Sequence, residues 1–249
     1  MPYFEHGTEK VFFVDKGIGA PVLLLPGNTA SSAVYASEID FFSQFFRVIC
    51  PDYPGCGKSG RISDLPEDFW WYNARVCTDL IGHLNIDSYT VVGSSGGGII
   101  ALIMAVISGN SVRCAIAESI PGEFPNSEDL KSEVKQRETP SEDLRVFWEI
   151  AHGEDWQQVV EFDSRLILKA ADSTESIYRG RLNEINCPVL LTGSLSDDSI
   201  SNVETGLCSI ARRIKNSKVV LFPEGNHPLM WSMPDQFRAE AVRFINEKY

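Results

Sequence analysis

Short apolar runs alternate with longer amphipathic stretches along most of the chain. Runs rich in Val, Ile, Leu and Phe, bounded by polar residues, glycine or proline, are typical of strands. They predict strands at Lys10–Val14, Val22–Leu25, Phe46–Cys50, Tyr89–Val92, Arg113–Ala117, Val189–Leu191 and Val219–Phe222. The stretches with helical periodicity predict helices at Val34–Phe45, Phe69–Leu84, Gly96–Ser108, Ser201–Ile214 and Pro234–Lys248. This alternation indicates an α/β fold, with a mostly parallel central sheet and helices on both faces.

The alternation stops after Glu118. Between residues 119 and 186 the sequence shows helical segments and no convincing strand. Thr139–Glu142 predicts the start of one helix, with Pro140 at its first helical position, and Ser201–Glu204 is a capping box that predicts the start of another. We expect residues 1–118 and 187–249 to form the α/β core and residues 119–186 to form a helical cap or lid. The alternative is that these helices simply pack on the core.

Length and charge narrow the classes of function. A chain of 249 residues, 43% of them hydrophobic, suffices for one large α/β domain or two small ones. The 22 basic and 34 acidic residues give a formal net charge of −12. Nucleic acids and anionic membrane surfaces are bound through basic patches, so we expect neither as a partner.

We expect a cytoplasmic setting. Residues 1–10 carry charges and no apolar core, which is not the pattern of a secretory signal, and the longest apolar run, Ile99–Ile107, is too short to span a membrane. The six cysteines are scattered without disulfide or zinc spacing, and most are expected to be buried. The sequence indicates neither a metal site nor a cofactor.

A serine lies at a small-residue corner between a predicted strand and a predicted helix. Residues 93–97 read Gly-Ser-Ser-Gly-Gly. A Gly-x-Ser-x-Gly corner holds the serine hydroxyl clear of the backbone, and its glycines let the strand and helix approach closely. The amide of Gly96, at the start of the helix, is free to stabilise an anionic oxygen. Ser95 is therefore the candidate nucleophile and Gly96 a candidate oxyanion donor.

A serine nucleophile needs a base and an acid that orients the base. Of the four histidines, His227 lies in a loop just past the last predicted strand, where functional groups gather in open parallel sheets. The acid should follow another strand end. We assign it to Asp197, with Asp198 as the alternative and Glu118, at the end of an earlier strand, as a third candidate.

Two further strand ends carry glycine-containing loops. The amide of Asn28, after the strand that ends at Leu25, is a candidate second oxyanion donor. Gly57-Lys58-Ser59 suggests a phosphate-binding loop, but the earlier glycine position of that motif holds Asp52. Asp52–Ser59 is therefore better explained as a glycine-rich turn that leaves a strand.

Taken in chain order, these segments resemble the α/β-hydrolase fold family over essentially the whole chain. Pro26–Asn28 resembles the family's oxyanion loop, Asp52–Ser59 its structural Asp-x-x-Gly-x-Gly-x-Ser segment, and Gly93–Gly97 its nucleophile elbow. The resemblance also implies that Ser95, Asp197 and His227 follow the family order Ser…Asp…His, and that the insertion after Glu118 lies where family members carry a cap.

The chain departs from the family pattern at two positions. The oxyanion loop usually begins His-Gly, whereas this chain has Pro26 before the glycine. The acid motif often reads Gly-x-x-Asp, which would place the acid at Ser196, so one extra residue is needed to reach Asp197.

The residues predict a cofactor-free serine hydrolase that acts on a small ester, thioester or related acyl compound. An aspartate at the elbow would instead indicate dehalogenase or epoxide hydrolase chemistry. A carbon–carbon bond hydrolase, a lactonase or a perhydrolase would use the same triad, and a non-catalytic small-ligand receptor is the alternative outside enzymes. The acidic predicted cap, with Trp148 and Trp156 on its underside, favours neutral or apolar substrates over polyanions.

Overall fold

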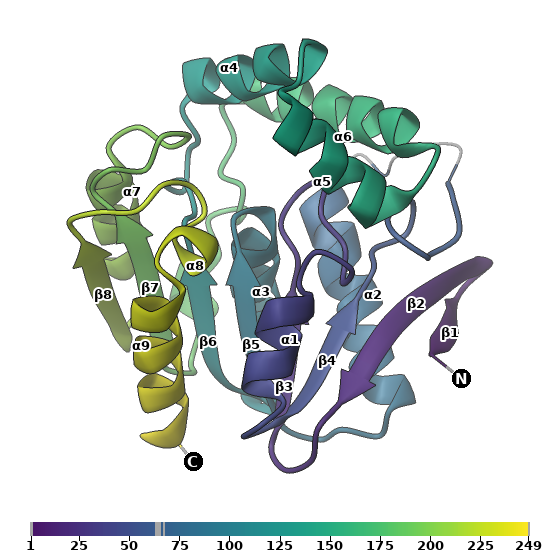
Figure 1. Cartoon of the computed structure of the whole chain (residues 1–249). Helices are drawn as coiled ribbons and strands as arrows, with labels where there is room; N and C mark the ends of the chain where they lie inside the picture. The colour runs from purple at the N-terminus through teal and green to yellow at the C-terminus, as the bar shows by residue number, and fades with distance from the viewer. Residues whose placement is uncertain (1, 63–65, 67, 249) are drawn as a thin grey trace.

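The computed structural model describes residues 2–62, 66 and 68–248. Within them, eight strands form one sheet in the order β1-β2-β4-β3-β5-β6-β7-β8 (Figure 1). Strands β3 to β8 are parallel to one another. At one edge of the sheet, β2 pairs antiparallel with β4, and β1 pairs antiparallel with β2. Their bounds are Tyr3–His6 (β1), Glu9–Lys16 (β2), Pro21–Leu25 (β3), Arg47–Pro51 (β4), Tyr89–Ser94 (β5), Val112–Glu118 (β6), Val189–Ser194 (β7) and Ser217–Phe222 (β8).

Helices cover both faces of this sheet, and each face has its own apolar core. Because side chains alternate along a strand, Val22 and Leu24 of β3 point to one face while Leu23 and Leu25 point to the other. The first face packs mainly against α1 (Ala36–Phe42) and α9 (Pro234–Asn246), and the second mainly against α2 (Phe69–His83), α3 (Gly96–Ile107) and α7 (Val203–Ala211). A short helix α8 (Leu229–Ser232) and two 3₁₀ turns, Gly109–Ser111 and Leu182–Glu184, complete these layers.

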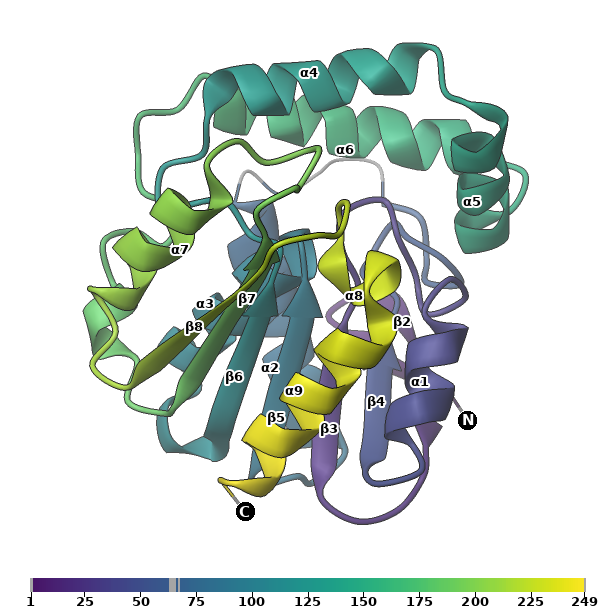
Figure 2. The ribbon, with the colours of Figure 1, turned by 60° about the vertical axis from the view of Figure 1, so that its left-hand side comes forward.

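Three further helices are inserted between β6 and β7. These are α4 (Ser127–Glu138), α5 (Glu142–His152) and α6 (Trp156–Ala171), called the inserted helices below. They lie beyond the carboxyl ends of the parallel strands, with α4 and α6 side by side and α5 at one end of the pair (Figures 1 and 2). The loops that follow β3, β5, β7 and β8 therefore lie between the sheet and the inserted helices.

The predicted elements are present with shifted ends, and the structure adds one strand. β1 is a short, mainly polar edge strand that pairs with β2 through the turn at Gly7, so it lacks the apolar run that marks a central strand. The prediction that Pro140 is the first helical residue of α5 is wrong by two positions. Ser141 caps this helix by accepting a hydrogen bond from the Leu144 amide at 3.2 Å, so Pro140 precedes the cap.

The predicted capping box at Ser201–Glu204 does not form. The N-terminal residue of α7 is Val203, and Asn202 before it adopts a left-handed conformation with φ of 52°. The amide and hydroxyl of Ser201 instead donate hydrogen bonds to Asp129 of α4. A contact between distant segments thus replaced the local cap.

Candidate active site

Ser95 lies at a sharp turn between β5 and α3. Its backbone has φ of 53° and ψ of −123°, a left-handed φ that a serine rarely adopts. The neighbouring glycines make this turn possible, since a Cβ on Gly93 would lie 2.1 Å from the Gly97 carbonyl oxygen, and one on Gly97 would lie 2.2 Å from that of Leu25. The predicted strand–corner–helix geometry is therefore present, with a serine at its apex.

The structure brings Ser95, His227 and Asp197 together in one hydrogen-bonded chain. His227, in the loop after β8, places Nε2 3.0 Å from Ser95 Oγ and Nδ1 3.0 Å from Asp197 Oδ2. The other oxygen of Asp197 accepts hydrogen bonds from the backbone amides of Ser199 at 3.0 Å and Ile200 at 2.8 Å. The carboxylate is thus held from both sides, with its side chain only 1% exposed.

The two alternative acids take other roles. Asp198 accepts a hydrogen bond from the backbone amide of His227 at 2.8 Å, which ties the loop after β7 to the loop after β8. Glu118 is fully buried and accepts a hydrogen bond from the Met230 amide at 3.0 Å. The turn that follows Gly193 accommodates the extra residue, so Asp197 is the carboxylate that contacts the imidazole.

The environment of the pair favours charge separation between imidazole and carboxylate. Burial acts to lower the pKa of His227, but the hydrogen bond and charge of Asp197, together with the charge of Glu118, raise it above its ordinary value. Burial acts to raise the pKa of Asp197, but the hydrogen bond and charge of His227 lower it. Asp197 is therefore ionised over a wide pH range, and the imidazole is a stronger base than a free one.

The loop after β3 packs directly against the elbow. A Cβ on Gly96 would lie 1.9 Å from Asn28 Oδ1 and 3.1 Å from the Asn28 amide nitrogen. Among the described residues, the backbone amides of Asn28 and Gly96 donate no hydrogen bond to another protein group. The two predicted donors thus flank Ser95 with their N–H groups available to a ligand oxygen.

Two tyrosines that the sequence analysis missed hold the loop that begins with Pro26. The hydroxyl of Tyr53 donates a hydrogen bond to the Pro26 carbonyl at 3.0 Å, and the hydroxyl of Tyr35 accepts one from the Gly27 amide at 3.1 Å. Both rings are buried. Because these partners are distant in sequence, no local pattern could have identified them.

His152, at the end of α5, also fixes this loop. Its Nδ1 accepts a hydrogen bond from the Gly57 amide at 3.0 Å, so the proton lies on Nε2, which is 2.9 Å from the Thr29 carbonyl oxygen. Burial lowers the pKa of His152 to about 4. Asp52 holds the neighbouring turn by accepting hydrogen bonds from the amides of Ser32 and Lys58, both at 2.7 Å, in keeping with the structural role expected for Asp52–Ser59.

Ser95 and His227 line two cavities. The larger, of about 690 Å³, extends toward α5 and α8 and is lined in part by Tyr35, Phe147, Trp148 and Trp231. The smaller, of about 100 Å³, extends toward α2 and α6 and is lined in part by Trp70, Ile99, Pro125 and Ile167. We call them the large and the inner cavity.

The expectation that both Trp148 and Trp156 lie on the underside of the cap is half right. Trp148 lines the large cavity, whereas Trp156 stacks on it with ring centroids 5.3 Å apart and lines a separate depression between α4 and α6. Helical spacing placed both aromatics on their helices, but the packing of α5 against α6 decided which one faces the cavity.

The described residues contain no group of three or more His, Cys, Asp or Glu side chains placed to hold a metal ion. None of their helices combines the length and apolarity needed to span a membrane. All six cysteines are unpaired, and five of them are buried.

Comparison with known proteins identifies the family of the chain. Residues 22–240 match the model of the alpha/beta hydrolase family. The serine hydrolase BPHL of Homo sapiens is 27% identical over 241 residues, which covers 90% of this chain and 78% of the relative. Haloalkane dehalogenase 2 of Mycobacterium tuberculosis is 34% identical over 114 residues, but this stretch is 45% of the chain and spans only 38% of the dehalogenase.

A solved structure extends the likeness to the whole fold. A hydrolase from Pseudomonas aeruginosa superimposes with a TM-score of 0.77 at 14% identity, covering 98% of this chain and 97% of that one. On the strength of the family match over residues 22–240, the chain belongs to the alpha/beta hydrolase family.

Proposed function

We propose that this protein is a serine hydrolase that cleaves a small ester, thioester or related acyl compound. The observation that carries the proposal is the hydrogen-bonded chain from Ser95 Oγ through the His227 imidazole to Asp197, with both links at 3.0 Å. A serine at the elbow provides an alkoxide nucleophile, whereas dehalogenase chemistry would need a carboxylate there.

In the proposed reaction, Ser95 Oγ attacks the acyl carbon while His227 Nε2 takes its proton. Asp197 holds the imidazole with Nδ1–H toward the carboxylate and stabilises the imidazolium that forms. The backbone N–H groups of Asn28 and Gly96 stabilise the oxyanion, and loss of one such donor costs roughly 3 kcal/mol of transition-state stabilisation. His227 then protonates the leaving oxygen or sulfur, and water deprotonated by the same imidazole releases the acyl group.

Residues 119–186 act as a cap in this proposal. The inserted helices supply one wall of both cavities, with Phe147 and Trp148 on the large cavity and Ile167 on the inner one. Carboxylates from Asp129, Glu133 and Asp198 also line these cavities, so a polyanion would be repelled. A neutral or apolar small molecule is therefore the proposed substrate, and the unpaired cysteines support a reducing, cytoplasmic setting.

The test is covalent labelling with a fluorophosphonate, followed by intact-mass measurement. Wild type should gain one adduct, and Ser95→Ala should gain none while keeping its fold by circular dichroism. Ser94→Ala is the matched control, because it removes the adjacent, fully buried hydroxyl and should label as wild type does. On the ester that a screen identifies, Ser95→Ala should lower kcat by about a millionfold.

The outcomes separate the candidate functions. An adduct that persists in Ser95→Ala contradicts the assignment of the nucleophile. A folded wild type that neither labels nor turns over acyl compounds, yet binds a small ligand, favours the receptor function. Labelling without ester or thioester turnover directs the screen to lactones, carbon–carbon bond substrates and peracid formation.

A further inference from the structure

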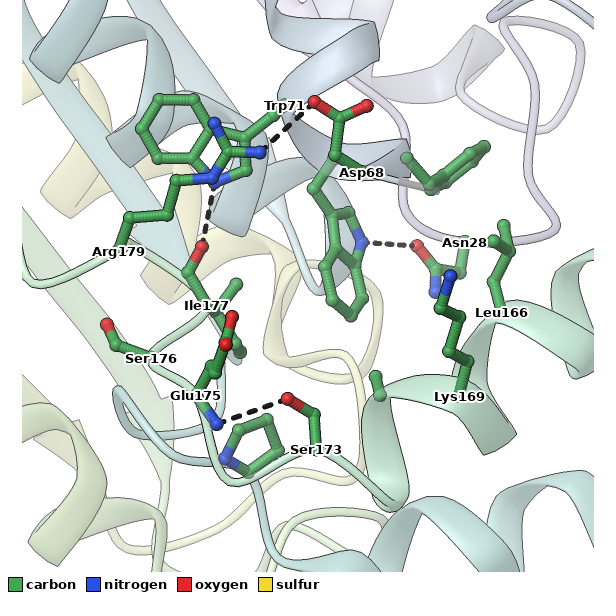
Figure 3. A pocket seen from close by; sticks show the side chains of 14 residues that line it. Asn28, Asp68, Trp71, Leu166, Lys169, Ser173, Glu175, Ser176, Ile177 and Arg179 are labelled. Carbon is green, nitrogen blue, oxygen red and sulfur yellow. Dashed lines mark hydrogen bonds and ion pairs between the residues drawn. The ribbon is translucent and has the colours of Figure 1, made fainter. Parts of the chain in front are cut away.

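A third cavity lies beside the inner cavity but does not reach Ser95. It has a volume of about 330 Å³ and lies between the start of α2, the end of α6 and residues 173–179 (Figure 3). We call it the outer cavity. Its lining includes the apolar side chains of Phe69, Trp71, Leu166 and Ile177.

Trp70 is one of three residues at the border between the outer and the inner cavity. Asn28, Trp70 and Pro125 line both cavities, whereas Ser95 and His227 line only the inner one of these two. Trp70 Nε1 donates a hydrogen bond to Asn28 Oδ1 at 3.3 Å, which holds the half-buried Trp70 side chain at this border. The Trp70 side chain is therefore held in place by a hydrogen bond to the loop after β3.

Beside its apolar residues, the outer cavity is lined by four charged side chains, those of Asp68, Lys169, Glu175 and Arg179. The Asp68 carboxylate pairs with Arg75 at 3.0 Å and with Arg179 at 3.1 Å. The guanidinium of Arg179 also lies over the Trp71 ring, 4.3 Å from its centroid (Figure 3). Since Asp68 and Arg179 are paired with each other, an alkyl chain that contacts the aromatic and aliphatic side of the cavity would not displace this ion pair.

We propose that Trp70 is the specificity-determining residue that limits the acyl chain of the substrate, and that the outer cavity is a subsite closed off by its indole. This inference rests on the proposed function, in which the acyl carbon lies at Ser95. In this proposal the leaving group occupies the large cavity and the acyl group occupies the inner one. The inner cavity, about 100 Å³, is smaller than the roughly 150 Å³ cavity that holds a benzene molecule, so it accommodates only a short acyl group. Removal of the indole would join the inner and outer cavities into one continuous cavity.

The first experiment compares kcat/KM for 4-nitrophenyl butyrate and 4-nitrophenyl decanoate. Wild type should prefer the butyrate. Trp70→Ala should raise the decanoate-to-butyrate ratio by about tenfold or more, because each buried methylene adds favourable contact. Trp70→Phe, which keeps a wall but lacks the N–H group, should stay close to the wild-type ratio.

A second variant fills the outer cavity from its far side. Leu166 lines the outer cavity and neither of the cavities at Ser95. Leu166→Trp, added to Trp70→Ala, should return the ratio toward the wild-type value without lowering butyrate turnover. If Trp70→Ala and Trp70→Phe lower both rates alike and leave the ratio unchanged, Trp70 only holds Asn28 and the proposal is overturned.

A binding measurement separates this inference from the proposed function. In a Ser95→Ala background, isothermal titration calorimetry with the unreactive ketones 2-undecanone and 2-hexanone needs no catalysis. Trp70→Ala should tighten binding of the long ketone by about tenfold and leave the short one little changed. If no ester is turned over but this shift occurs, the proposed function fails, while Trp70 still limits the length of the ligand that binds beside residue 95. Unchanged ketone affinities overturn the role of Trp70.

Discussion

The sheet side and the inserted-helix side of the candidate active site are stabilised in different ways. On the sheet side, α3 is buried along its whole length from Gly96 to Val106, between β5 and the neighbouring helices. In α4, by contrast, Val134 is the one buried hydrophobic residue, and its Arg137 reaches Asp163 of α6 through an ion pair at 2.7 Å. Apolar packing fixes the candidate nucleophile, whereas a buried ion pair helps to join two of the helices that cover it.

This difference assigns separate tasks to the two sides. Close packing leaves few alternatives to the native geometry, which suits a chain of hydrogen bonds that must stay at 3.0 Å. Ion pairs and hydrogen bonds between mostly polar helices tolerate rearrangement, which suits the walls of a substrate cavity. Substitutions on the sheet side should therefore change kcat, and those on the inserted helices should change stability or substrate preference.

The largest effect should come from Asp197→Asn. The amide cannot stabilise the imidazolium or hold the correct tautomer, so kcat should fall by about ten-thousandfold with little change in KM. Asp198→Asn is the matched control one residue away, and it should keep most of the turnover because its oxygen can still accept the His227 amide. Comparable losses in steady-state kinetics would contradict the separation of roles between the two carboxylates.

Arg137→Met should destabilise the packing of α4 against α6 and leave the stability of the sheet unchanged. The Arg137 and Asp163 side chains are only 6% and 7% exposed, so removal of one partner leaves a buried charge at a cost of about 3–5 kcal/mol. Hydrogen exchange should accelerate in α4 and α6 and remain slow in β5 and β6. The double variant Arg137→Met, Asp163→Leu should regain most of the protection from hydrogen exchange. If the double variant stays unprotected, or if Arg137→Met exchanges as slowly as wild type, then packing and not the ion pair joins these helices.

His152 should make the junction between the two sides sensitive to acid. Its pKa is lowered to about 4 in the folded chain, so the unfolded chain binds this proton more readily. Stability should therefore be lost as the pH falls from about 6.5 to about 4, by about 3 kcal/mol in total, and no further below that. Urea unfolding at pH 7 and pH 4.5 checks this.

His152→Gln serves as the comparison, since its amide can accept from Gly57 and donate to Thr29 without titrating in this range. The free energy of unfolding of this variant should change less between the two pH values than that of wild type. Equal changes in both proteins would mean that other groups cause the acid sensitivity.

The smallest effect should follow Glu118→Gln on the sheet side. The buried Glu118 carboxylate helps to raise the pKa of His227, and catalysis needs the neutral imidazole. Removal of that charge should lower the pKa of His227 and move the acid limb of the kcat/KM profile to lower pH, with the plateau rate largely kept. An acid limb that stays in place, or moves to higher pH, would show that this charge does not reach the imidazole.

Local patterns predicted the parts of the molecule that depend on near neighbours. Apolar runs placed the central strands, and the glycines around Ser95 predicted a tight corner because only residues without a Cβ fit there. The choice of Asp197 also followed from order along the chain, although Asp198 stayed open. Predictions failed where a distant group competed with a local one, as when Asp129 took the hydrogen bonds of Ser201.

By itself, then, the sequence determined the α/β alternation, the elbow at Ser95, and the presence of His227 and candidate acids after later strands, because strands, helices and turns follow from spacing over a few residues. Only the tertiary structure decided which carboxylate meets the imidazole, which tyrosines hold the Pro26 loop, and where His152 and Trp70 make their contacts. The partners in these contacts lie 8 to 123 residues apart along the chain. Their distances depend on how the helices pack on the sheet, which no short window of sequence records.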